Sequence, residues 1–414
     1  MRFPTARTHV VIAGGGVAGV ELALALHALA GGRVRLTIVA PNADFELRPL
    51  RTAEPFAADH VRRHSLAALA DEVGAELVAD AVERVDPDRR SLLLAGGGTV
   101  AYDALVVAVG AQHKVAYSRA LTFTGDTSTV SFNGLLADID EGWTHAVSFV
   151  VPPGTTWTLP LYELALMTAR EARSMGMDGV RLQIVSPETA PLALFGPEPS
   201  AAVAELLATA GIDFRGETYA RAGDDGRLVL LPGGEPIDTE RIVALPTIAG
   251  PWIAGLPADR CGFIPIDDEL RVTGVEDVYA AGDGTTFPVK QGGIACQQAD
   301  AIAEHLAAAA GAPIAPKPFR PVLRGRLLTG TGAQYLEHPI HGGDGAGAPP
   351  ELRLWSVPRK IDGRYLSPWL AAQEGRRRHD PVRTGDVEVA VEIDARAAGR
   401  AAMRLEPYSP LPTR

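Results

Sequence analysis

The sequence predicts an α/β fold in which one domain is interrupted by a second and followed by a C-terminal cap region. A strand at His9–Ala13 runs directly into a glycine-rich turn at 14–19, and an apolar helix and a second strand at 33–40 follow it. A new α/β pattern begins near Thr144, and a strand at Val278–Asp283 resumes the first pattern far downstream. Strand, turn, helix and strand form a βαβ unit of the kind that binds dinucleotides. We therefore predict two Rossmann-like dinucleotide-binding domains, the first of them discontinuous.

The domain boundaries follow the order of these patterns along the chain. Residues 1–112 and 250–312 form the first domain, residues 113–249 the second, and residues 313–414 the cap region. A run of prolines between Pro313 and Pro321 opens the cap region, and proline interrupts a helix because it lacks the amide hydrogen.

Composition, charge and cysteine content exclude several classes of protein. The chain of 414 residues is 46% hydrophobic, but it has no apolar run near the ~20 residues that a membrane helix needs. Its net charge of −11 excludes a general nucleic-acid binder, because affinity for phosphate backbones comes from basic residues. Two cysteines, Cys261 and Cys296, suit a reducing compartment, and a strand that begins by His9 leaves no room for a secretory signal. We expect a cytoplasmic protein without a metal site, since no HExxH or CxxC pattern occurs.

Each glycine of the first turn has a mechanical reason. Gly14 permits the tight turn, Gly16 lets the backbone approach a pyrophosphate, and Gly19 allows the helix to pack closely on the strand. The diphosphate would then lie against the amides at the helix start, where Val17 and Ala18 stand.

One position departs from the usual pattern of such a turn. The acidic residue that binds the ribose hydroxyls at the end of the second strand is replaced by Ala40. Either Asn42 or Asp44 takes its place, or the adenosine ribose is held differently. No arginine stands at this point, so a cofactor with a 2′-phosphate is not implied.

Three segments together resemble the pyridine nucleotide–disulfide oxidoreductase superfamily of flavoproteins. They are the turn at 14–19, the strand Tyr102–Gly110 and the strand Tyr279–Asp283. The resemblance implies FAD as the cofactor and places Asp283 near its ribityl–phosphate part. Gly110 and Gly282 belong to the same segments and are predicted to contact FAD.

The segment Phe287–Ala299 is most similar to one branch, the sulfide:quinone reductases and type II NADH dehydrogenases. In the dehydrogenases an AQxAxQ motif at this place borders the quinone. Ala295 and Gln297 fit that motif, while Gly292 and Gly293 replace its first two letters. The resemblance implies that two electrons pass from a small-molecule donor through FAD to a quinone-like acceptor, with Gly293 beside the cofactor.

The turn of the second domain lacks the glycines that a nicotinamide dinucleotide needs. Prolines at 152 and 153 remove backbone donors, and Trp157 and Leu159 would fill the space of a pyrophosphate. NADH binding in the usual mode is therefore disfavoured. Two alternatives stay open: an NAD(P)H-dependent reductase with a non-standard turn, and a FAD-binding protein without turnover.

Three side chains are candidates for catalysis, and each has a structural alternative. Glu163 matches a glutamate that the dehydrogenases keep near the flavin, where it would handle protons or orient the substrate, but acids also favour the first turn of a helix. Lys290 would place positive charge near the flavin or remain solvated. Cys296 stands near a helix start, where thiol pKa values fall, but we favour a structural role because the usual partner cysteine is absent. Arg48 would meet the pyrophosphate or stay in solvent.

The C-terminal segment 355–370 mixes aromatic and basic residues. Such a composition suits contact with the inner face of a membrane. We favour the alternative, in which the segment covers the flavin domain or makes a homodimer contact.

Overall fold

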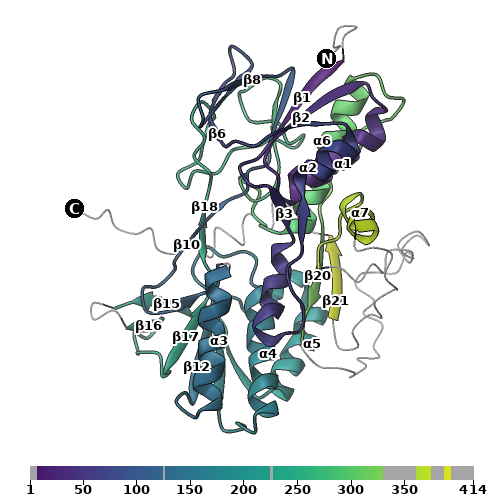
Figure 1. The fold of residues 1–414 in the computed structure, drawn as a ribbon. Coiled ribbons are helices and arrows are strands. Elements are labelled where there is room, and N and C mark those ends of the chain that lie inside the picture. The colour runs from purple at the N-terminus through teal and green to yellow at the C-terminus, as the bar shows by residue number, and fades with distance from the viewer. Residues whose placement is uncertain (1–6, 125, 224–226, 330–359, 374–386, 393–414) are drawn as a thin grey trace.

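The structure is a computed structural model that describes residues 7–124, 126–223, 227–329, 360–373 and 387–392. It confirms the predicted α/β class, with two parallel sheets arranged one above the other (Figure 1). Of the segment 355–370, residues 355–359 lie outside the described residues. Among the described residues, no helix is both long and apolar enough to cross a membrane.

The first sheet is parallel and has the strand order β19-β9-β1-β2-β5. Its strands are β1 Thr8–Ala13, β2 Val34–Val39, β5 Glu76–Val78, β9 Ala104–Val107 and β19 Val278–Ala280. Every residue of β1 is buried, because helices and loops cover both faces of a parallel sheet. The late strand β19 pairs with β9, so the chain returns to this sheet after the second domain.

Two helices, α1 (Val17–Ala30) and α6 (Gly292–Ala309), lie side by side next to this sheet (Figure 1). The same domain contains α2 Leu66–Val73, the 3₁₀ helix η1 Arg48–Phe56, the antiparallel strands β6 Val82–Asp86, β7 Ser91–Leu94 and β8 Thr99–Ala101, and the pair β3 Asp44–Glu46 and β4 Arg63–Ser65.

The second sheet is also parallel, in the order β11-β17-β12-β13-β14. Its strands are β11 Leu121–Thr122, β12 Ala146–Val150, β13 Arg181–Val185, β14 Ile212–Arg215 and β17 Arg241–Ala244. Its helices are α3 Asp126–Asp140, α4 Leu159–Ser174, α5 Pro197–Thr209 and the 3₁₀ turn η2 Ala193–Phe195, and a hairpin is formed by β15 Tyr219–Ala222 and β16 Leu228–Leu231. The path β12–α4–β13 is a βαβ unit, as a Rossmann-like second domain requires.

Two segments connect the halves of the molecule. One is an antiparallel pair of strands, β10 (Gln112–Lys114) and β18 (Thr247–Ala249). The predicted domain boundary at 112/113 lies within β10, and the predicted boundary at 249/250 lies directly after β18. The C-terminal strand β20 (Val322–Leu327) lies between α4 and α6 and pairs with β21 (Val387–Glu392), while α7 (Leu366–Gln373) contacts α1 (Figure 1).

Candidate functional site

The glycine turn joins β1 to α1 at the carboxyl edge of the first sheet. Gly14 has a φ of +124°, and a Cβ atom there would lie 2.2 Å from the carbonyl oxygen of Ala108. A Cβ atom on Gly19 would lie 1.9 Å from the carbonyl oxygen of Gly14. Both glycines are therefore required by the packing of the turn itself.

Gly16 is different, because the space beside it is open. It is exposed, and no atom lies within 4 Å of the position that a Cβ atom would take. Gly16 is the N-cap of α1, and no side chain caps this helix. The amides of Val17 and Ala18 in the first turn are thus the groups that an incoming pyrophosphate would meet. The turn fits the diphosphate of a dinucleotide.

The ends of β9 and β19 lie beside this turn, since the two strands follow β1 in the sheet. Gly110 and Gly282 have φ values of +75° and +80°. The amide of Gly282 donates a hydrogen bond to Oε1 of Gln298 at 2.7 Å, which fastens the β19 end to α6. Asp283 follows, and its carboxylate accepts no hydrogen bond from the described part of the chain. Burial raises its pKa, and the charges of Lys290 and His113 oppose that rise.

Positively charged and titratable side chains surround Asp283. Lys290 donates a hydrogen bond to the carbonyl oxygen of Thr285, and its Nζ lies 4.1 Å from the centroid of the Phe263 ring. Burial lowers the pKa of Lys290 to about 8, although Asp283 acts in the opposite direction. His113 lies on the exposed strand β10, and partial desolvation of its imidazole lowers its pKa. The charge of Asp283 raises this pKa, and that of Arg48, which is exposed at the start of η1, lowers it. The structure therefore brings the predicted residues Arg48, Asp283 and Lys290 close to His113. His113 stands only three positions after Gly110, but it was not identified as a site residue from the sequence.

Glu163 is fully buried in the first turns of α4 and is held from three directions. Its carboxylate accepts hydrogen bonds from Thr52 Oγ1 of η1 at 2.9 Å and from the amide of Leu328 at 2.8 Å. It also forms an ion pair with Lys360, whose side chain is only 6% exposed. Burial raises the pKa of Glu163, and Lys360 is the largest influence that lowers it. Lys360 lies in the basic and aromatic segment noted above, but sequence alone gives no sign that it meets Glu163.

The start of α6 explains one of the two departures from the AQxAxQ motif, the glycine at position 292. A Cβ atom on Gly292 would lie 2.5 Å from Cδ1 of Ile361. A Cβ atom on Gly293 would lie 3.0 Å from Oε1 of the Gln291 side chain and in ordinary contact, at 3.6 Å, with the carbonyl oxygen of Asp362. Gln297 is engaged as well, because its amide exchanges two hydrogen bonds of 2.8 Å with the backbone of Val322. Ile361 thus occupies space that a longer side chain at position 292 would need.

Cys296 is completely buried. Its Sγ lies 3.0 Å from the position of a Cβ atom on Gly363. Burial raises the pKa of the thiol well above its ordinary value, and the negative charges of Glu21, Asp300 and Asp362 act in the same direction. These effects outweigh that of the helix start and favour the structural interpretation of Cys296. Cys261 is exposed.

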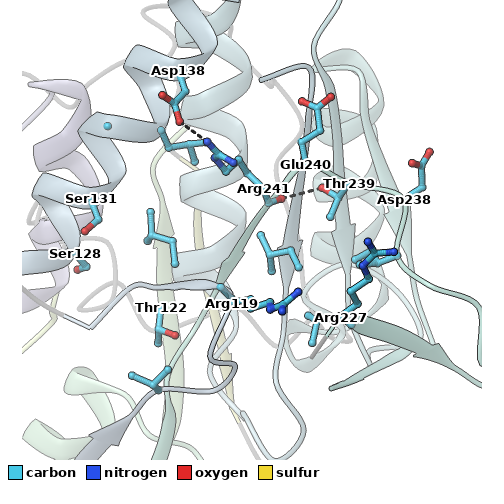
Figure 2. Close-up of a pocket in the computed structure, with 18 of the residues that line it drawn as sticks. Arg119, Thr122, Ser128, Ser131, Asp138, Arg227, Asp238, Thr239, Glu240 and Arg241 are labelled. Atoms are coloured by element: carbon cyan, nitrogen blue, oxygen red, sulfur yellow. Dashed lines mark hydrogen bonds and ion pairs between the residues drawn. The ribbon is translucent and has the colours of Figure 1, made fainter. Parts of the chain in front are cut away.

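A hollow of about 1100 Å³ lies in the second domain, and none of the predicted site residues lines it. Figure 2 shows side chains of α3, β11 and β17 around it. The charged groups are of both signs, and an ion pair of 2.8 Å joins Arg241 to Asp138 across one wall. Among the described residues, no three His, Cys, Asp or Glu side chains are grouped so that they could hold a metal ion.

Comparison with known proteins gives the relationships of the chain. The sequence model of the pyridine nucleotide-disulphide oxidoreductase family matches residues 5–141 and 163–307. The ferredoxin reductase component of chlorobenzene dioxygenase from Cupriavidus sp. is 29% identical over 322 residues, which are 75% of each chain. An NADH dehydrogenase-like protein of Mycobacterium tuberculosis is 27% identical over 299 residues, which are 67% of this chain and 72% of that protein.

Solved structures show the same fold at low sequence identity. The sulfide:quinone oxidoreductase of Aquifex aeolicus has a TM-score of 0.65 and 20% identity, covering 72% of this chain and 76% of its own. The ferredoxin reductase for the CYP199A2 system of Rhodopseudomonas palustris has a TM-score of 0.57 and 21% identity, covering 77% and 79%.

Proposed function

Because the chain belongs to the pyridine nucleotide-disulphide oxidoreductase family, it is a FAD-dependent oxidoreductase, and we propose that it passes two electrons from a small-molecule donor to a quinone-like acceptor. When bound, FAD supplies the electron-transfer chemistry, while the protein holds and adjusts the cofactor. In this proposal Gly14, Gly16 and Gly19 shape the pyrophosphate site, and the amides at 17 and 18 bind the diphosphate.

The remaining predicted contacts lie around the carboxyl edge of the first sheet. We assign Asp283 to the ribityl part of FAD, and Arg48 to the negative charge of the pyrophosphate. Lys290 supplies positive charge that favours a reduced, anionic flavin. Gly110, Gly282 and Gly293 let the backbone approach the cofactor at the ends of β9 and β19 and at the start of α6.

The observation that carries the proposal is the buried ion pair of Glu163 and Lys360. Two charged side chains inside a protein are costly unless they are paired and hydrogen-bonded, and strongly perturbed pKa values are typical of functional sites. The pair lies where α4, η1 and β20 meet. We propose that Glu163 accepts or donates a proton during oxidation and reduction of the flavin, with Lys360 setting its charge.

The acceptor is assigned from the α6 segment. Ala295 and Gln297 match a quinone-bordering motif, so we propose that the protein works in the cytoplasm and meets an amphiphilic quinone at the inner face of the membrane. The amide of Gln297 is, however, bonded to Val322, so we assign the acceptor to a place beside this segment and not to this side chain.

A second candidate function is an NAD(P)H-dependent ferredoxin reductase. It is favoured by the 29% identity to a ferredoxin reductase component over three quarters of the chain. A third candidate is a FAD-binding protein without turnover. Flavin reduction and reoxidation separate all three.

The test is an anaerobic experiment on the purified protein with its bound FAD. After chemical reduction by dithionite, the flavin is mixed separately with a water-soluble quinone and with an oxidised ferredoxin. We expect saturable reoxidation by the quinone and none by the ferredoxin. The opposite order would favour the ferredoxin reductase, and no reoxidation by either would favour the protein without turnover.

A further inference from the structure

Glu188 lies just after β13, the second strand of the β12–α4–β13 unit. In a dinucleotide-binding unit, an acidic residue at this place accepts hydrogen bonds from the adenosine ribose. Here hydroxyl groups of the chain itself occupy both carboxylate oxygens. Oε1 accepts a hydrogen bond from Thr158 at 3.0 Å, and Oε2 accepts bonds from Tyr162 at 2.7 Å and Ser186 at 2.8 Å.

The place for a pyrophosphate in this unit is filled as well. Trp157 packs on Phe195 with the ring centroids 5.7 Å apart, and Leu159 is buried at the start of α4. The strand β20 lies directly on these side chains. A Cβ atom on Gly325 of β20 would lie 2.5 Å from Phe195 Cζ and 3.0 Å from Leu159 Cδ1. The cap region therefore covers the carboxyl edge of the sheet at the point where a dinucleotide would enter.

The end of the turn that faces the first domain is closed by a direct hydrogen bond. Thr156 Oγ1 donates to the carbonyl oxygen of Pro288 at 2.6 Å. Pro288 belongs to the segment between β19 and α6 that carries Lys290. A nicotinamide ring approaching from the second domain would have to separate these two segments.

We propose that the second domain has no dinucleotide site, because its own hydroxyl groups replace the ribose at Glu188 and its own apolar side chains replace the pyrophosphate. The residues present do not fit NAD(P)H, although the family is named for pyridine nucleotides. The electron donor is then a small molecule without a nucleotide, which specifies the donor of the proposed function and rests on it.

The test measures binding and not turnover. The FAD-loaded protein is titrated calorimetrically with ADP-ribose, which carries the adenosine and diphosphate but no nicotinamide, and then with NADH and NADPH. We expect no saturable binding of any of the three. Saturable binding of ADP-ribose or of either dinucleotide would overturn the inference.

Variants of Glu188 give a second readout. Glu188→Ala leaves three hydroxyl groups without their acceptor, so we expect the melting temperature to fall by several degrees. Glu188→Gln keeps one acceptor oxygen and should recover part of that loss. A Glu188→Ala protein that melts like the wild type would contradict the internal network. The proposed function is tested separately from this inference. A protein without bound FAD, or one whose FAD dithionite does not bleach, would contradict the proposed function regardless of whether ADP-ribose binds.

Discussion

Replacement of Lys360 by methionine tests the buried ion pair that carries the proposed function. The change keeps the aliphatic stem but leaves the carboxylate of Glu163 with two hydrogen-bond donors and no countercharge. Removing one partner of a buried pair costs about 3–5 kcal/mol, because the other charge stays buried and uncompensated. Since 1 kcal/mol corresponds to roughly 2–4 °C in a domain of this size, we expect the melting temperature to fall by about 10 °C.

Arg324→Met is the matched control for this variant. Arg324 forms an ion pair of 3.2 Å with Asp362 in the same C-terminal segment, but both side chains are about a quarter exposed. Such a partly solvated pair contributes about 0–1 kcal/mol, so the control should melt within a few degrees of the wild type. The double variant Glu163→Leu with Lys360→Met should recover part of the loss, because it removes both charges.

The raised pKa of Glu163 also predicts how the stability of the protein changes with pH. The folded-state pKa of Glu163 is raised above its ordinary value of 4.5, so its contribution to stability is fully present below about pH 4.5 and is lost as pH rises through the folded pKa. Without Lys360 that pKa rises further, and the loss should extend to higher pH. Thermal melts across a pH series measure this. Equal melting temperatures of the Lys360→Met and Arg324→Met proteins at every pH would refute the reasoning.

Three further predictions concern the cofactor site. A Cβ atom at position 16 meets no atom within 4 Å, so we expect Gly16→Val to fold but to retain less than about a tenth of its FAD. In Gly19→Ala the Cβ atom meets a carbonyl oxygen at 1.9 Å, so this variant should have a lower melting temperature. FAD retention by Gly16→Val would contradict the pyrophosphate assignment. Cys296→Ser should reduce its flavin at a rate within about twofold of the wild type, because a buried thiol of raised pKa is a poor nucleophile. Single-turnover absorbance of the flavin measures this rate. A large loss of rate in the variant would indicate that Cys296 has a redox role. The pKa of Lys290 in the folded protein is about 8, below its ordinary value of 10.5, so its contribution should make the protein more stable as pH rises from about 8 to 10.5. Thermal melts of Lys290→Met over the same pH range should lack this increase in stability. An increase retained in the variant would show that another group causes it.

Local motifs predicted the parts of the site that lie on consecutive residues. The turn at 14–19 and the segment at Asp283 were recognisable because each pairs a buried strand with glycines whose backbone geometry no other residue adopts easily. The parallel sheets followed from the spacing of those strands, and their pairing confirms the predicted α/β class.

Contacts between distant residues could not be predicted in this way. Lys360 lies 197 positions from Glu163, and only the fold of the cap region brings them together. The environment of Cys296 likewise depends on α1 and on residues 362–363, so the expected effect of a helix start was outweighed by burial. The place of Glu188 just after β13 was a signal that could have found it, but its hydrogen bonds to Thr158 and Tyr162 depend on how α4 packs on the strand end and could not be read from the sequence.

The pH dependence of flavin reduction in wild type and Glu163→Gln tests the central claim most directly. Both proteins would be loaded with FAD and mixed anaerobically with the same reductant over a pH series, and the decrease of flavin absorbance would be followed. A proton-handling side chain contributes typically 10²–10⁴-fold to rate. The account predicts an ionisation in the wild-type profile, above the ordinary pKa of a glutamate, that is absent from a variant slowed by about 10²-fold. Superimposable profiles at equal rates would contradict it, because Glu163 would then be a structural residue.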